Sequence, residues 1–134
     1  MDEQEIAERL EAVEKKSNAM YTAVALILLG FVIIGFILNF SVYMNSSSFQ
    51  KMFKDMLGGE PLPVITEYYF YTKQFIMVGD LICVIASIFC FYKRDKPRRL
   101  LIIAGIAVYL SFKWSISTLA MFLPLMKLIE MIGA

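Results

Sequence analysis

The sequence predicts an all-α integral membrane protein: a helical bundle with three transmembrane helices, a short N-terminal cytoplasmic helix and an outer amphipathic helix. Three observations support this fold class. Hydrophobic residues make up 59% of the 134 residues. They gather in three runs long enough to cross a hydrocarbon core about 30 Å thick. Lysines and arginines cluster between the second and third runs, as in a short turn on one side of a membrane.

Composition also excludes several functional classes. The chain has no histidine, and its two cysteines lie seven residues apart in one apolar run, so we expect neither a zinc site nor a disulfide between them. A Ser/His/Asp triad cannot exist without histidine, and no glycine-rich phosphate loop occurs. A net charge of +1 does not fit a nucleic-acid-binding protein. We therefore expect a non-enzymatic protein with no cofactor and no metal.

Residues 1–19 are expected to form a cytoplasmic amphipathic helix. Apolar and small residues recur there every three or four positions, the spacing of a heptad seam. The pairs Glu5–Arg9 and Glu11–Lys15 lie one turn apart and favour the helix. The helix is either a coiled-coil contact with another copy or a partner, or a solvated lead-in to the membrane. The seam consists of Ile6, Leu10, Val13, Ser17 and Met20.

Residues 20–134 are expected to form the transmembrane domain. Its first apolar run is too long for the core of a secretory signal, so we expect it to be retained as a span. The expected segments, in chain order, are the first span 21–43, the outer loop 44–73, the second span 74–92, the cytoplasmic turn 93–99 and the third span 100–123.

Two positions near the ends of spans carry further expectations. Asn39 lies toward the far end of the first span and is expected to reach outward to the interface. Pro124 is expected to end or kink the third helix. Residues 124–134 are then an outer interfacial segment or pack on the bundle, and a fourth span requires a break near Lys113.

The outer loop is expected to contain a helix of its own. Ser46–Ser48 can cap its start, and Gly58 and Gly59, followed by Pro61 and Pro63, can end it. Apolar side chains between them share one helical face. This face rests on the outer leaflet, covers the mouth of the bundle or docks a partner. It consists of Phe49, Met52, Phe53, Met56 and Leu57.

A buried ion pair is expected between the second and third spans. Asp80 precedes Lys93 by 13 positions, and Lys113 follows Arg99 by 14. At about 1.5 Å per residue, both charges lie about 20 Å from the turn, well inside the bilayer. A lone charge there costs roughly 2.5–3.5 kcal/mol, so opposite charges at equal depth should pair. The pair is either a clamp that fixes helix register or part of a proton or ion pathway.

Small and polar residues form a stripe on each of the helices that carry these charges. Such faces let helices approach closely in lipid, and they could equally line a pore between copies. On the second span the stripe flanks Asp80, and on the third it flanks Lys113. Its members are Gly79, Cys83, Ser87 and Cys90 on the second span and Gly105, Tyr109, Ser117 and Ala120 on the third.

Basic residues set the expected orientation. Eight lie in the N-terminal segment and the turn, against four in the outer loop and the C-terminal segment. This asymmetry places the N-terminus in the cytoplasm and the C-terminus outside. The turn sets the topology and can in addition contact anionic lipid headgroups. Its basic residues are Lys93, Arg94, Lys96, Arg98 and Arg99.

The outer hairpin resembles a known family. The stretch Phe49-x-x-Met52-Phe53-x-Asp55-Met56-x-Gly58-x-x-x-Leu62-Pro63-x-x-Thr66 lies between two spans. It is similar to the outer turn of the polytopic inner-membrane platform proteins of type II secretion and type IV pilus systems. The resemblance covers about 37–81. It implies a hairpin that turns at Leu62, Pro63 and Thr66. The chain departs from the family by an insertion containing Pro61, and residues 1–19 do not replace the family's large cytoplasmic domains, so only the hairpin geometry is implied.

We expect the chain to act as an assembly or accessory subunit of a membrane complex. The alternative is a small homo-oligomeric ion or proton channel lined by the polar faces of the second and third spans. The expected partners are membrane lipids and either further copies of the chain or a larger membrane complex, and not nucleic acid. The expected location is the bacterial cytoplasmic (inner) membrane.

Overall fold

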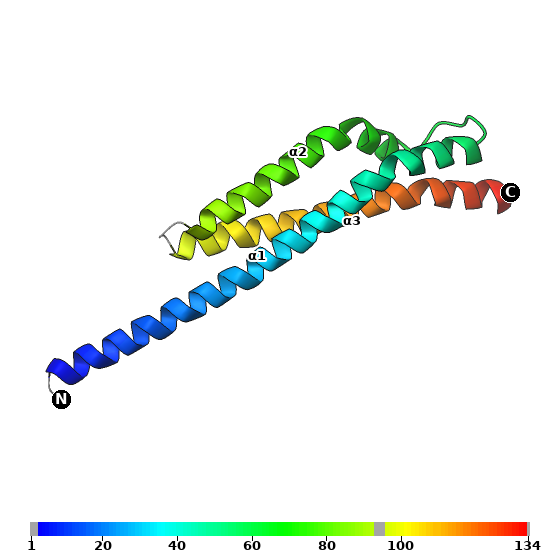
Figure 1. Cartoon of the computed structure of the whole chain (residues 1–134). Coiled ribbons are helices and arrows are strands. Elements are labelled where there is room, and N and C mark those ends of the chain that lie inside the picture. Colours follow the sequence, from blue (N-terminus) through cyan, green and yellow to red (C-terminus); the bar gives the residue numbers. More distant parts are fainter. Residues whose placement is uncertain (1–2, 93–95, 134) are drawn as a thin grey trace.

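The computed structural model describes residues 3–92 and 96–133, which are helical almost throughout. Three helices follow one another: α1 (Glu3–Met56), α2 (Val64–Tyr92) and α3 (Lys96–Gly133). α1 and α3 run in the same direction and lie against each other, and α2 runs back beside them (Figure 1). No strand occurs in these ranges. Each helix is long and apolar enough to cross a membrane, in agreement with the predicted all-α membrane bundle.

α1 is one unbroken helix of 54 residues, about 80 Å long at 1.5 Å per residue. The separate helices expected for 1–19, 21–43 and the outer loop are therefore wrong. Proline is absent from this stretch, so nothing forces a break. Ser46 does not cap a new helix. Its hydroxyl donates to the carbonyl of Tyr43 at 2.6 Å, a local bond that lets serine remain inside a helix.

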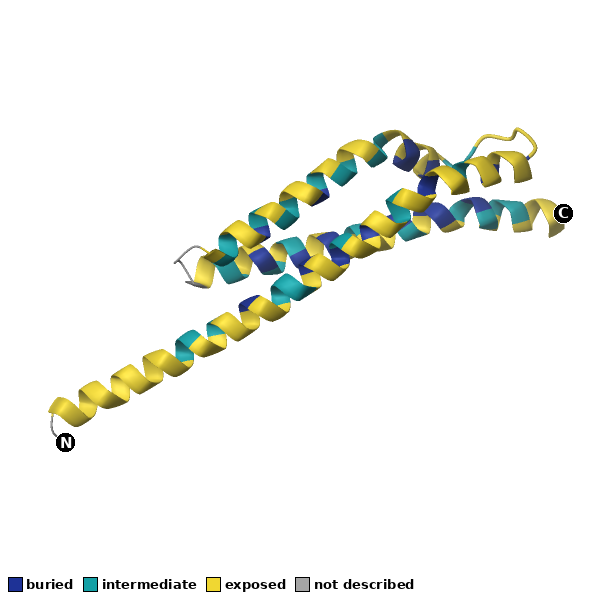
Figure 2. Ribbon diagram, in the orientation of Figure 1, coloured by how far each residue is buried: buried dark blue, intermediate teal, exposed yellow. Residues whose placement is uncertain are grey.

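The N-terminal third of α1 leaves the bundle. It extends beyond the other two helices (Figure 1), and it is exposed except for half-buried positions at its inner end, among them Ser17 and Asn18 (Figure 2). No residue from Glu3 to Val24 is buried, and the first buried residue of α1 is Ala25. This segment is the charged, heptad-patterned part of the sequence. α1 therefore joins an exposed polar segment to an apolar segment that packs in the bundle.

α1 ends at the predicted pair of glycines. Gly58 and Gly59 have φ values of 59° and 93°, which glycine adopts without strain. Pro63 immediately precedes α2, and its carbonyl accepts the amide of Glu67 at 3.0 Å, the first bond of the helix. α2 starts at Val64, ten residues before the predicted second span at 74, so the turn over 57–63 is much shorter than the predicted loop over 44–73.

Only part of the predicted amphipathic face near the end of α1 is buried in the bundle. Phe53 and Leu57 are each 2% exposed and pack into the bundle. Phe49, Met52 and Met56 are 37–45% exposed. This segment is not a separate helix, because it is the C-terminal part of α1, which is continuous through Met56.

α3 passes through Pro124 without ending. Pro124 is fully buried inside the helix, which continues to Gly133. The predicted helix end at this proline is wrong, because residues 124–133 continue α3. Lys127 donates to the carbonyl of Pro61 at 2.9 Å and pairs with Glu60 at 3.1 Å. The last turns of α3 therefore pack against the α1–α2 turn.

Two apolar clusters fill the bundle, with a polar layer between them. One cluster lies toward the α2–α3 turn and the other toward the α1–α2 turn. The first comprises Val32, Ile103, Ala107 and Leu110, and the second comprises Tyr69, Phe70, Ala120 and Met121. The polar layer is the candidate functional site described below.

α1 and α3 approach each other closely at Gly35. A Cβ added to Gly35 would lie 3.2 Å from the Cβ of Leu110, whereas one added to Gly30 would have nothing within 4 Å. Small residues allow this kind of approach between membrane helices.

Replacing Gly35 with valine should therefore destabilise the bundle by about 1–3 kcal/mol, because the added side chain forces α1 and α3 apart. The measurement is the free energy of unfolding in mild-detergent micelles. Gly30→Val is the matched control and should cost clearly less. Equal losses for the two variants would show that the helices do not meet at Gly35.

Candidate functional site

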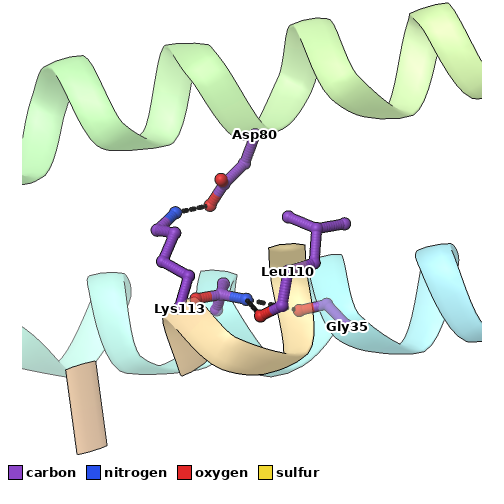
Figure 3. A network of polar contacts seen from close by, with 5 residues as sticks. Gly35, Asp80, Leu110 and Lys113 are labelled. Atoms are coloured by element: carbon purple, nitrogen blue, oxygen red, sulfur yellow. Dashed lines mark hydrogen bonds and ion pairs between the residues drawn. The ribbon is translucent and has the colours of Figure 1, made fainter. Parts of the chain in front are cut away.

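The ammonium of Lys113 on α3 pairs with Oδ2 of Asp80 on α2. Figure 3 shows the two side chains reaching toward each other across the gap between their helices. The Asp80 side chain is 1% exposed and that of Lys113 is 13% exposed. The structure thus brings together the two charges that equal depth along neighbouring helices predicts to meet. The contact joins α2 to α3 inside a single chain.

Asp80 uses only one of its carboxylate oxygens for this pair. Its Oδ1 is buried and has no hydrogen-bond partner within residues 3–92 and 96–133. Asp80, Lys113, Tyr69, Lys73 and Ser117 line a cavity of about 10 Å³. A space of that size holds at most one water molecule. The polar layer is therefore tightly packed and not an open channel through the bundle.

Asn39 is the third member of the polar layer, and sequence reasoning missed it. Its side-chain amide donates to the carbonyl of Gly35 at 2.8 Å and to that of Leu110 on α3 at 3.2 Å. Asn39 is 4% exposed, so the predicted outward position is wrong. A signal was present in the sequence: Asn39 follows Gly35 by four residues and Val32 by seven, which puts it on the packed face of α1.

Further polar bonds join the helices nearer the α1–α2 turn. Thr66 is fully buried and donates to the carbonyl of Ala120 on α3 at 2.6 Å. Lys73 donates to the hydroxyls of Ser46 and Ser47 on α1, at 3.2 and 3.1 Å. Together with Asn39, these bonds tie every pair of helices, so polar contacts hold α2 and α3 on α1.

The predicted stripe on α2 lies on the packed side of the helix. Ser87 is buried like Asp80, and Gly79, Cys83 and Cys90 are half-buried. Both thiols are free. This face turns toward α1 and α3, which fits helix packing and does not fit a pore lining on the outside of the bundle.

The predicted stripe on α3 lies on the packed side of the single chain only in its second half. Ser117 and Ala120 are buried, but Gly105 is exposed and Tyr109 is 52% exposed. A step of four residues in an α-helix advances about 40° beyond a full turn. The three such steps from Gly105 to Ser117 thus carry the stripe about 120° around the helix. The packed face follows Ile103, Ala107 and Leu110 instead.

The basic turn between α2 and α3 is only partly described. Lys93 and Arg94 lie outside the described residues, and so does the side chain of Lys96. Arg98 is exposed. Arg99 donates to the carbonyl of Phe91 at 2.7 Å, which caps the last turn of α2. Arg99 thus stabilises the end of α2, in addition to its predicted role in setting the orientation in the membrane.

The polar groups of this layer form noncovalent contacts between the helices. Within the described part of the chain, no group of three His, Cys, Asp or Glu side chains is placed to hold a metal ion. The charged and amide groups bond to one another and to backbone carbonyls of neighbouring helices. This arrangement suits a clamp that fixes the register of three helices.

No protein-family model, curated protein or solved structure matches this chain. The resemblance of residues 37–81 to platform proteins therefore stays a prediction. Of the residues that carry it, Leu62 packs on the second apolar cluster, Pro63 immediately precedes α2 and Thr66 bonds to α3. The function proposed below rests on the geometry of the chain itself.

Removing one charge of the ion pair should be far more damaging than removing both. Asp80→Ala leaves the Lys113 ammonium buried without a partner and should cost about 3–5 kcal/mol of unfolding free energy in detergent micelles. The double variant Asp80→Leu with Lys113→Met should recover most of this loss, because an apolar pair of similar volume can replace a buried ion pair.

The exposed pair Glu5–Arg9, whose side chains are 51% and 72% exposed, supplies the control. Glu5→Ala should cost less than about 1 kcal/mol. If the double variant at 80 and 113 is no more stable than Asp80→Ala, the ion pair does not act as a clamp.

Replacing Asn39 with leucine should destabilise the bundle by about 1–2 kcal/mol, since the bond to the Leu110 carbonyl is lost and that carbonyl stays buried. Asn45→Leu is the matched control, because Asn45 is exposed and donates only within its own helix, to Ser41 at 2.8 Å. Thermal unfolding of both variants in the same detergent gives the comparison. A loss at Asn45 as large as that at Asn39 would contradict the role of Asn39.

Proposed function

We propose that the chain is a non-enzymatic membrane subunit that binds other proteins of a membrane complex through the projecting N-terminal third of α1. One observation carries the proposal: residues 3–20 form a continuous helix in which no side chain is buried, and only Ser17 and Asn18 are half-buried. A solvated helix with a row of exposed apolar side chains is a usual docking element. The rest of the molecule then anchors and orients this helix.

The closed interior of the bundle supports a binding role over catalysis. Asp80 and Ser117 are 1% and 3% exposed, and the cavity beside them is about 10 Å³. A substrate pocket normally measures several hundred Å³. The chemically distinctive residues thus serve contacts between helices.

We further propose that the N-terminus and the turn over 93–99 face the cytoplasm of a bacterial inner membrane. The projecting part of α1 lies beyond the end of the bundle that carries this turn, while the α1–α2 turn lies at the opposite end with the C-terminus (Figure 1). Eight of the 13 lysines and arginines belong to the proposed cytoplasmic side. The docking helix would then meet cytoplasmic or membrane-bound partners.

A second candidate is a homo-oligomeric ion or proton channel. The unpaired Oδ1 of Asp80 beside Tyr69, Lys73 and Ser117 is the observation that favours it, because buried ionisable groups mark many proton paths. The apolar clusters on both sides of the polar layer oppose passage through the interior of one chain. A pore between copies would need polar groups on the outside of the bundle, whereas Asp80 and Ser117 are buried inside it. We therefore rank the channel second.

Affinity purification in mild detergent should separate the two functions. The full chain should bring down larger membrane-complex proteins in fixed proportion, and a variant without residues 3–18 should lose them while keeping its fold. The control replaces Ile129 and Ile132 with serine, since both are exposed at the far end of α3. Retention of the partners by the truncated chain would overturn the docking role. Proton flux in liposomes containing the pure chain would favour the channel.

A further inference from the structure

The exposed seam on the N-terminal third of α1 has the properties of a self-pairing surface. We propose that residues 3–20 of two copies pair as a parallel two-stranded coiled coil. This inference deepens the proposed function and rests on its premise that the projecting helix is a contact element: the apolar seam pairs two copies, and other proteins of the complex then meet the charged outer faces of the paired helices. In heptad terms, Leu10 and Ser17 occupy a positions, and Ile6, Val13 and Met20 occupy d positions.

The seam is the main apolar surface of this segment. Leu10, Val13 and Met20 are 65%, 66% and 67% exposed, and Ile6 is 41% exposed. The remaining positions are mostly charged or polar, with alanine as their apolar exception. A polar helix with one narrow row of large apolar side chains matches the a/d pattern of a coiled coil more closely than the wider face of a globular helix.

Charge complementarity selects the partner and its direction. In this register Arg9 occupies a g position and Glu14 the following e position. A parallel dimer places the g residue of one helix beside the e residue of the next heptad on the other, so two identical Arg9–Glu14 pairs form. An antiparallel dimer would instead bring g residues together, and Arg9 and Lys16 would repel.

The Arg9 side chain is available for this contact. In the single chain it pairs with Glu5 at 3.1 Å on a fully solvated surface. An exposed pair of this kind contributes little, so its exchange for an interhelical pair costs little.

Pairing along the seam does not compete with the packing of the bundle. α1 contacts α2 and α3 through Ala25, Val32 and Asn39, which recur every seven residues at b positions. In a helix of 3.5 residues per turn, b lies about 100° away from a. Beyond Met20 the same seam continues through Val24, Ile27 and Phe31, which are 42–61% exposed. A second copy can therefore contact α1 without displacing α2 or α3.

The membrane compensates for the weak association of a short seam. About two and a half heptads associate only weakly in solution. Two copies held in one bilayer have a high effective concentration and the same threading, which also fixes the helices as parallel. The pairing thus requires the full chain in a membrane.

Disulfide cross-linking in membranes tests the register. Because the native thiols are Cys83 and Cys90, single cysteines are placed in a Cys83→Ala, Cys90→Ala background. Under mild oxidation, Leu10→Cys and Val13→Cys should form covalent dimers readily. Glu8→Cys, at an f position on the opposite face, should cross-link at least several-fold less. Equal cross-linking at all three positions, or none at positions 10 and 13, overturns the inference.

Charge exchange tests the pairing of Arg9 with Glu14. Arg9→Glu should lower cross-linking through Val13→Cys several-fold, and so should Glu14→Arg, whereas the double exchange should restore it. No restoration would contradict the parallel register. Absent cross-links combined with partner loss on deletion of residues 3–18 would reject self-pairing and leave the proposed function standing. Partner retention after that deletion would reject the function itself.

Discussion

The buried contact between Asp80 and Lys113 constrains the rest of the structure. A charge in apolar surroundings is costly, and its partner must sit at the same height on the neighbouring helix. One turn away on α3, Leu110 stands opposite Gly35 of α1, and its carbonyl accepts from the amide of Asn39, so α1 is held next to the ion pair. The apolar clusters above and below then close around the polar layer. A short turn between α2 and α3 makes the register attainable, because both charges lie nearly equal distances along their helices from it.

Much of this arrangement could be predicted from the sequence because it depends on distances along helices. The ion pair follows from counting residues away from the basic turn, and the end of α1 follows from Gly58 and Gly59. The continuity of α1 could not be predicted in the same way. Hydropathy marks where the chain meets lipid, whereas a helix ends only where the backbone is forced to change direction, and neither Tyr21 nor Ser46 does that.

The position of side chains around a helix was harder to predict than their height. Gly105 and Tyr109 share a stripe with Lys113 by spacing, yet they face away from the bundle because steps of four drift around the helix. The sequence favours an outward position for Asn39, because polar residues near the end of a span often reach the interface. The choice between that position and a buried one depends on Leu110, which only the fold brings near.

Polar side chains in this chain therefore have two separate roles. Inside the bundle it joins helices, and at the N-terminus it surrounds a seam that the single chain leaves uncovered. Solid-state NMR in lipid bilayers, with nitrogen labels on lysine and carbon labels on aspartate, tests the central contact most directly. The structure predicts a strong dipolar coupling between Lys113 Nζ and the carboxylate carbon of Asp80, as for an ion pair within about 4 Å. Absence of that coupling in the folded protein would contradict the account.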